Sequence, residues 1–234
     1  MSTKKIFVDA AYQKDCEATV VEIRNDEAGI PRIVILDQTV FYAMSGGQPG
    51  DTGFVTGPHG EERVSDTRYV DNEKKVIGHF MDGTTKLKVG DRITGKIDWG
   101  RRYRHMQLHS LVHISALLFD QQCGLQKCIG SNIADKGRID YEYFGEINVE
   151  ALQKQAEHLI QEDHAISTHG DGDDEVKRIW EMQPLGTIPC GGTHVKSSRE
   201  IGKIELKRKS LGKQGQRIYC QVLTSPIDSL ETSK

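Results

Sequence analysis

The character of the sequence changes at Trp99-Gly100, and this change limits the possible folds more than any other feature. Before it, short β-branched runs such as ATVVEIRN, IPRIVILD and DRITGKIDW are separated by Gly, Asp, Asn and Pro. Several short strands at this spacing predict a small β-barrel or sandwich. We therefore expect a β-rich domain over residues 1–99 and a second domain over residues 100–234.

The second half of the chain combines helices with strands. Residues 101–120 (RRYRHMQLHSLVHISALLFD) place apolar side chains at helical spacing. Asn148 suits the N-cap of a second helix that extends to about His164. Strands return near RIW, KIELKRK and RIYCQVL. The pattern predicts an α+β protein whose second domain contains helices and an antiparallel sheet.

Charge, hydropathy and cysteine content argue against an integral membrane protein, a secreted protein and a disulfide-rich protein. The 31 basic and 34 acidic side chains give a net charge of −3, and no apolar run approaches the roughly 18 residues of a membrane span. The first residues, MSTKKIFVDAAYQKD, lack the apolar region and cleavage site of a signal peptide, so we expect a cytoplasmic protein. Because five cysteines is an odd number, we expect reduced thiols, with Cys123 and Cys128 buried.

Histidines and a cysteine recur at spacings that suit a metal ion. His105, His109 and His113 follow one another every four residues, so each neighbouring pair lies on one helix face with Cβ atoms about 6 Å apart. Far downstream, CGGTH offers the thiolate of Cys190 and the imidazole of His194. Either pair alone is more often an ordinary core or surface feature, whereas both in one chain predict a metal site. Two imidazoles, a thiolate and a fourth nitrogen suit Zn²⁺.

Two further segments have both a functional and an ordinary interpretation. The loop TVFYAMSGGQPGDTG, residues 39–53, is rich in glycine, which allows positive φ angles and close approach of a ligand but is also common in plain turns. Residues 199–217 form a basic run, which is either a surface for phosphate contacts or a solvated pair of charged strands. The basic members of this run are Arg199, Lys203, Lys207, Arg208, Lys209, Lys213 and Arg217.

The order HxxxH followed by CGGTHV resembles the editing domain of alanyl-tRNA synthetases and their free-standing relatives, the AlaX trans-editing proteins. The resemblance covers nearly the whole chain, from the GGQ-containing loop through RRYRHMQLHSLVH to CGGTHVKSSREIGKIELKRKSLGKQGQRIYCQV. The GGQ loop makes the chain similar to the medium-length, two-domain type. That type implies a small N-terminal β-barrel domain followed by a zinc-containing α/β editing domain.

The resemblance also implies roles for individual residues. The family helix reads His-Ser/Thr-x-x-His, a pattern that only HSLVH matches in this chain. One zinc ion per chain is therefore implied, held by His109, His113, Cys190 and His194. Substrate contacts near the editing pocket are implied for Gly46, Gly47 and Gln48.

Two histidines fall outside this set. His105 occupies a position that the family does not use as a ligand, which leaves it a supporting or surface role and makes it a candidate for proton transfer. His158 stands where relatives often carry Asn, so its role stays open.

The implied reaction is hydrolysis of the aminoacyl ester at the 3′ end of a tRNA for alanine that carries serine or, less readily, glycine. This activity would serve the fidelity of translation. A zinc ion with an open position either lowers the pKa of its water to about 7 or orients the substrate's amino group. A site that hydrogen-bonds the serine hydroxyl rejects alanine, which lacks it. The basic run would lie beside the metal, where the terminal phosphates of the tRNA must lie.

Two other functions stay open on the sequence alone. One is a non-catalytic tRNA-binding module with a structural zinc ion, and the other is a zinc hydrolase that acts on a small ester. Structural zinc usually has a closed, cysteine-rich set of four ligands, whereas three-histidine sites often keep a water, so the pattern favours catalysis. An assay of deacylation separates the three.

Overall fold

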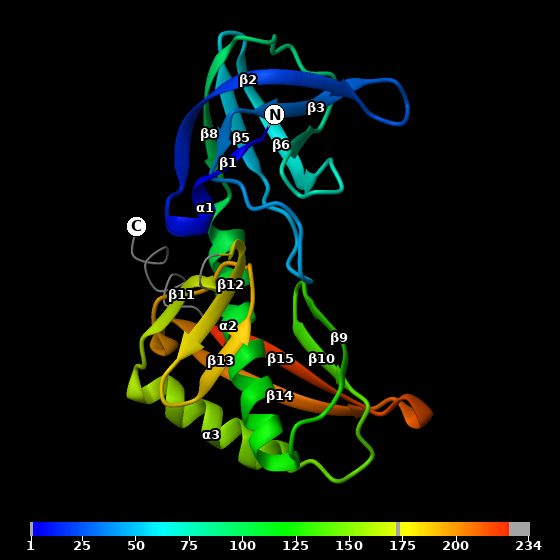
Figure 1. Cartoon of the computed structure of the whole chain (residues 1–234), viewed down its shortest axis with the longest axis vertical. Coiled ribbons are helices and arrows are strands. Elements are labelled where there is room, and N and C mark those ends of the chain that lie inside the picture. The colour runs from blue at the N-terminus through cyan, green and yellow to red at the C-terminus, as the bar shows by residue number, and fades with distance from the viewer. Residues whose placement is uncertain (1, 172–173, 225–234) are drawn as a thin grey trace. The chain divides into compact units, whose positions relative to one another are not determined.

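The computed structural model describes residues 2–171 and 174–224, which form two compact units (Figure 1). The first unit contains the described residues up to Ser45 together with Pro49–Arg102. The second contains Gly46–Gln48 together with the described residues from Tyr103 onward. The tip of the glycine-rich loop therefore groups with the second unit, although the loop begins and ends in the first.

Six strands of the first unit close into an antiparallel barrel in the order β2-β3-β7-β6-β5-β8, which confirms the predicted barrel. Side chains alternate along the strands; in β8, Ile93 and Ile97 enter the core while their neighbours are exposed. β-Branched residues suit such a pleated, half-buried surface. The strands are β2 (Asp15–Asn25), β3 (Pro31–Leu36), β5 (Gly53–Gly57), β6 (Gly60–Tyr69), β7 (Ile77–Met81) and β8 (Arg92–Ile97).

Short elements complete the first unit. The two-residue strands β1 (Lys4–Lys5) and β4 (Gln38–Thr39) pair in parallel, and α1 (Ile6–Asp9) is a single helical turn.

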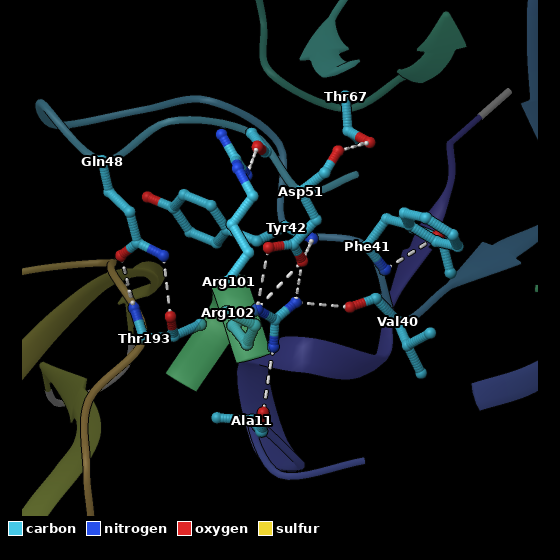
Figure 2. A network of polar contacts seen from close by, with 12 residues as sticks. Ala11, Val40, Phe41, Tyr42, Gln48, Asp51, Thr67, Arg101, Arg102 and Thr193 are labelled. Carbon is cyan, nitrogen blue, oxygen red and sulfur yellow. Dashed lines mark hydrogen bonds and ion pairs between the residues drawn. The ribbon is translucent and has the colours of Figure 1, made fainter. Parts of the chain in front are cut away.

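A buried ion pair closes the base of the glycine-rich loop within the first unit (Figure 2). Arg102 is fully buried, and its guanidinium donates to the Asp51 carboxylate and to the carbonyl oxygens of Ala11 and Val40. Asp51 also accepts from the Tyr42 N–H at 2.7 Å and donates its own N–H to the Tyr42 carbonyl at 2.9 Å. Buried charges persist where such bonds satisfy them. The two stems of the loop are thus bonded to each other.

The second unit contains two antiparallel sheets, of strand order β14-β15-β10-β9 and β11-β12-β13. The strands are β9 (Cys128–Ile133), β10 (Gly137–Tyr141), β11 (Ile166–Asp171), β12 (Asp174–Met182), β13 (Gly186–Pro189), β14 (Lys203–Ser210) and β15 (Gln216–Thr224). The helices are α2 (Trp99–Cys123), whose first turn belongs to the barrel unit, α3 (Val149–Glu162) and two short 3₁₀ segments, η1 (Ser198–Ile201) and η2 (Gly212–Gln214).

Helix α2 is buried on almost every side because it contacts both sheets (Figure 1). Phe119 stacks on Tyr141 of β10 with ring centroids 3.9 Å apart, and His113 meets Trp180 of β12 at 5.2 Å. The polar side chains of this helix are therefore enclosed, and they must find partners inside the protein. No helix in the described part of the chain is both long and apolar enough to span a membrane.

The ends of α3 agree with the predicted helix to within two residues. Oδ1 of Asn148 accepts from the Ala151 N–H at 3.0 Å, as expected of an N-cap, and the helix ends at Glu162 before Asp163, whose φ is +62°.

The expected burial of Cys123 and Cys128 is wrong. Cys128 is exposed and Cys123 is half-buried, because the first begins the edge strand β9 and the second ends α2. All five cysteines are free thiols, as predicted.

Candidate metal centre

Four side chains from two segments of the second unit converge on one point. His109 and His113 lie one turn apart on α2, and Cys190 and His194 lie in the loop that follows β13. Their ligand atoms all lie within 4.8 Å of one another. Sγ of Cys190 is 3.4 Å from Nε2 of His109 and 3.4 Å from Nε2 of His194. These are the four residues for which the sequence implied a metal.

The loop of residues 190–194 is shaped by its glycines. The Cys190 N–H donates to the Arg178 carbonyl at 2.8 Å, and the Gly192 N–H then turns back to Sγ of Cys190 at 3.3 Å. A Cβ atom at Gly192 would lie only 2.2 Å from Cε1 of His109. The close approach of this loop to α2 therefore requires glycine at position 192.

The electrostatics of the cluster fit a metal ion better than a set of charged side chains. Burial lowers the pKa of His113 to about 3, and burial together with the neighbouring imidazoles lowers the pKa of His109 and His194 far below the ordinary value. All three rings are therefore neutral, which is the form that binds metals. Burial also raises the pKa of the Cys190 thiol to about 11, and a nearby cation would reverse this shift by stabilising the thiolate.

One buried nitrogen gives independent support for a bound ion. Nε2 of His113 is buried, and it has no hydrogen-bond partner in the part of the chain that the structure describes. Such groups are rare and call for an explanation, which a metal ion held at this nitrogen would supply. Three imidazole nitrogens and one sulfur form a donor set that suits Zn²⁺. The residues present therefore fit the metal.

Polar groups behind two of the imidazoles hold their other ring nitrogens. Nδ1 of His109 lies 2.9 Å from Oε1 of Gln48, and Nδ1 of His194 lies 3.2 Å from Oγ of Ser110. The amide of Gln48 also contacts Thr193, as Figure 2 shows. Metal-binding histidines generally make such an outer contact, which fixes the orientation of the ring.

The surroundings of the cluster include residues whose roles were not predicted from the sequence. Ser110 lies within HSLVH and Thr193 lies within CGGTH, so their places inside the two motifs were the signal that could have identified them. Trp180 is fully buried with its ring against His113, but nothing in the local sequence around it indicates this contact. His105 is buried on α2, outside the cluster of four, and its proximity contributes to the low pKa of His109.

The tip of the glycine-rich loop reaches this cluster through one residue. The Gly47 carbonyl accepts from the Ile133 N–H at 2.8 Å at the end of β9. Gly46 is exposed and Gly47 is half-buried, whereas Gln48 is fully buried against His109. The other histidine of uncertain role, His158, is exposed on α3 and lies 3.3 Å from the Glu162 carboxylate.

The basic run follows η1, β14, η2 and β15, and four of its members have partners nearby. These pairs are Arg199 with Asp163, Lys207 with Glu205, Arg208 with Gln216 and Arg217 with Asp140, at 3.5, 2.8, 2.9 and 2.6 Å. The other three, Lys203, Lys209 and Lys213, are exposed and form no ion pair with any residue that the structure describes. Arg208, whose partner Gln216 is neutral, likewise forms no ion pair with a described residue, so no carboxylate in that part of the chain neutralises these four side chains.

Two family models match separate parts of the chain. Residues 3–101 match the model for tRNA synthetases class II (A). Residues 178–219, which include Cys190 and His194, match the model for the threonyl and alanyl tRNA synthetase second additional domain.

Individual relatives match the chain almost from end to end. Alanyl-tRNA editing protein AlaX-M of Pyrococcus horikoshii is 36% identical over 227 residues, covering 92% of this chain and 96% of the relative. AlaX-M of Methanosarcina barkeri is 34% identical, covering 93% of this chain and 98% of the relative. Alanine–tRNA ligase of Sulfurisphaera tokodaii is 29% identical, with 87% of this chain matched to 24% of the ligase. The chain therefore belongs to the AlaX family of alanyl-tRNA editing proteins.

Proposed function

We propose that this chain hydrolyses the aminoacyl ester of a tRNA for alanine that wrongly carries serine, with glycine as a poorer substrate. The observation that carries the proposal is the convergence of three imidazoles and one thiol within 4.8 Å. The names of the relatives, which describe alanyl-tRNA editing, support the same activity for this chain.

The metal centre would hold one zinc ion per chain through His109, His113, Cys190 and His194. When bound, zinc supplies Lewis-acid chemistry, either by lowering the pKa of a water molecule or by orienting the substrate's amino group. Burial in this chain keeps the imidazoles neutral and so ready to act as donors. His105, one turn before His109 on α2, is the candidate to hold a proton near the reacting ester.

Substrate selection is assigned to the segment Gly46–Gln48. Gly46 is exposed and Gly47 is half-buried, so a ligand could reach this part of the loop. A site that hydrogen-bonds the serine hydroxyl leaves its own polar group unpaired when alanine binds, which costs about 1–3 kcal/mol for each group. Correctly charged tRNA would therefore be spared.

We also propose that residues 1–99 and 100–234 act as two domains with separate roles. The first is a barrel domain that carries the GGQ loop, and the second is an editing domain that carries the metal centre. Phosphate contacts to the tRNA are assigned to the basic run of residues 199–217.

The amino-acid selectivity of hydrolysis tests the proposed reaction. Transfer RNA for alanine, charged in turn with serine, glycine and alanine, is incubated with the purified chain, and release of the amino acid is followed. We expect serine to be released fastest and alanine slowest, and we expect the Cys190→Ala/His194→Ala double variant to be inactive. Binding of tRNA without release would favour a non-catalytic module, and equal hydrolysis of a small seryl ester and the charged tRNA would favour a small-ester hydrolase.

The three lysines that form no ion pair with a described residue give a separate test of the tRNA-binding surface. Replacing Lys203, Lys209 and Lys213 by alanine should weaken tRNA binding and flatten its salt dependence, by roughly 0.7–0.9 in log–log slope for each phosphate that the variant no longer neutralises. The control replaces Arg199 and Lys207, which already have carboxylate partners, and should change the slope less. Hydrolysis of a small seryl ester should be unchanged in both. An equal fall in activity on tRNA and on the small ester would mean that these lysines support the fold.

A further inference from the structure

We propose that Gln48 is a positioning residue of the metal centre, whose side-chain oxygen holds the proton of His109 on Nδ1 and so leaves Nε2 free to bind the ion. The inference rests on the metal site of the proposed function. It extends that site to a residue 61 positions away from His109 along the chain.

The orientation of the Gln48 amide follows from its partners (Figure 2). The Thr193 backbone N–H can only donate, and it lies 3.1 Å from Oε1 of Gln48. Nε2 of Gln48 lies 2.8 Å from Oγ1 of Thr193 and donates to that hydroxyl. Because a main-chain group fixes the amide in this way, the atom that faces His109 is an oxygen, which can only accept.

The state of the His109 ring follows from the orientation of this amide. Nδ1 of His109 must carry the proton, since it lies 2.9 Å from an atom that only accepts. A neutral imidazole has one N–H, so Nε2 keeps its lone pair. That nitrogen lies 3.4 Å from Sγ of Cys190, within the group of four ligand atoms. Gln48 thereby selects the ring form that presents its donor to the metal.

Two glycines make the approach of Gln48 possible. Gly47 has a φ of +83°, and its carbonyl is held by the Ile133 N–H, which fixes the backbone immediately before Gln48. A Cβ atom at Gly192 would lie 3.0 Å from Oε1 of Gln48 as well as colliding with the His109 ring. Any larger residue at position 192 would therefore occupy the space in which the Gln48 amide meets the His109 ring.

The bonding of Gln48 also separates its role from that of the two preceding glycines. The side-chain oxygen of Gln48 accepts two hydrogen bonds and the side-chain nitrogen donates one. Gln48 is 0% exposed, so all three bonds are shielded from solvent. Within the segment proposed to select the substrate, the Gln48 side chain is therefore assigned to the metal centre, which leaves Gly46 and Gly47, neither of them buried, for the substrate contacts.

The zinc affinity of the full-length protein tests this role. Gln48→Leu removes the acceptor at similar side-chain size and should weaken zinc binding about 10- to 100-fold in competition with a coloured chelator. Gln48→Glu should restore most of the affinity, because a carboxylate also accepts from Nδ1 of His109. The control is Gln107→Leu, which alters a buried glutamine of α2 that donates to the Glu200 carbonyl at 2.7 Å, and should leave zinc affinity unchanged.

A spectroscopic measurement complements the affinities. In the zinc-loaded wild type and in Gln48→Glu, nitrogen-15 spectra of the imidazoles should show a protected proton on Nδ1 of His109, and Gln48→Leu should lose this protection. Equal zinc affinity of wild type and Gln48→Leu, or equal weakening in Gln107→Leu, would overturn the role of Gln48 and leave the proposed function standing. A wild type that binds no zinc would overturn both.

Discussion

At the scale of single residues, the candidate metal centre includes the thiol of Cys190, and the surroundings of this thiol disfavour its thiolate form. Burial raises the pKa of Cys190 to about 11, and the Gly192 N–H at 3.3 Å only partly opposes this. The adjacent rings of His109 and His194 are neutral and supply no positive charge to balance a thiolate. A cation among them would supply that charge, so we expect metal binding and loss of the thiol proton to be coupled.

Two adjacent glycines are predicted to respond very differently to the same substitution. A Cβ atom at Gly192 would lie 2.2 Å from the His109 ring, whereas one at Gly191 would meet nothing within 4 Å. Gly192→Ala should therefore lower zinc affinity by about tenfold or more and lower the free energy of unfolding by about 1–3 kcal/mol. Gly191→Ala is the control and should change neither. Chelator competition and denaturant unfolding measure the two effects, and wild-type zinc affinity in Gly192→Ala would contradict the geometry.

At the scale of secondary-structure elements, local spacing made much of the second unit predictable. The helical repeat of residues 101–120 and the two four-residue spacings predict α2 and two halves of a metal site, because both depend on neighbours along the chain. The sequence pattern predicts a helix that starts near Arg101, whereas α2 begins at Trp99. The exposure of Cys128 could not be predicted, because it depends on β9 being an edge strand.

Contacts between distant segments could not be predicted. Gln48 is 61 residues from His109 and 145 residues from Thr193, and no spacing rule connects positions so far apart. Trp180 likewise reaches His113 only because β12 and α2 pack together. Local spacing indicated a metal site and the family resemblance implied which histidines belong to it, whereas the residues that support the candidate ligands depend on tertiary contacts.

The barrel contains a buried histidine on β7 that should make its stability depend on pH. His79 is fully buried; its Nδ1 donates to the Val34 carbonyl at 3.0 Å, and its Nε2 accepts from the Thr39 hydroxyl at 2.8 Å. Burial lowers the pKa of His79 from 6.5 to about 4. The unfolded chain therefore binds more protons between these values, and stability is lost as the pH falls from about 6.5 to about 4.

The size of this effect follows from the width of that pH range. At about 1.4 kcal/mol for each pH unit, the loss attributable to His79 is about 3 kcal/mol. The free energy of unfolding of wild type and of His79→Gln, measured with denaturant at a series of pH values, isolates the contribution of His79. The histidines of the candidate metal centre titrate equally in the two proteins and cancel in the difference. The difference between the two curves should be constant above pH 6.5 and should shrink below it. A difference independent of pH would contradict the assignment.

At the scale of the whole molecule, the candidate metal centre takes its residues unequally from two stretches of sequence. All four proposed ligands lie after residue 103, but Gln48 comes from a loop whose stems belong to the barrel unit. The compact unit that holds the centre therefore includes three residues from the first half of the sequence. Removing the first half of the sequence should leave the four proposed ligands in place and remove Gln48, which supports His109.

A fragment of residues 101–234 tests this division. It should fold and bind one zinc ion, because it retains the four ligands, but about 10- to 100-fold more weakly than the full chain, because it lacks Gln48. Gln48→Leu in the full chain should weaken zinc binding to a similar extent. This variant therefore shows how much of the fragment's loss of affinity is due to the missing Gln48 side chain. Full affinity in the fragment would show that the loop tip does not support the centre. The fragment should also select serine over alanine less well, because it lacks Gly46 and Gly47.

The central claim is that editing occurs at the centre formed by His109, His113, Cys190 and His194, and metal removal tests it most directly. The purified chain is stripped with a chelator, and release of serine from mischarged tRNA for alanine is measured before and after zinc is returned in stoichiometric steps. We predict loss of activity on stripping and full recovery at one zinc ion per chain, with no recovery in the Cys190→Ala/His194→Ala variant. A stripped protein that releases serine at the original rate would contradict the account.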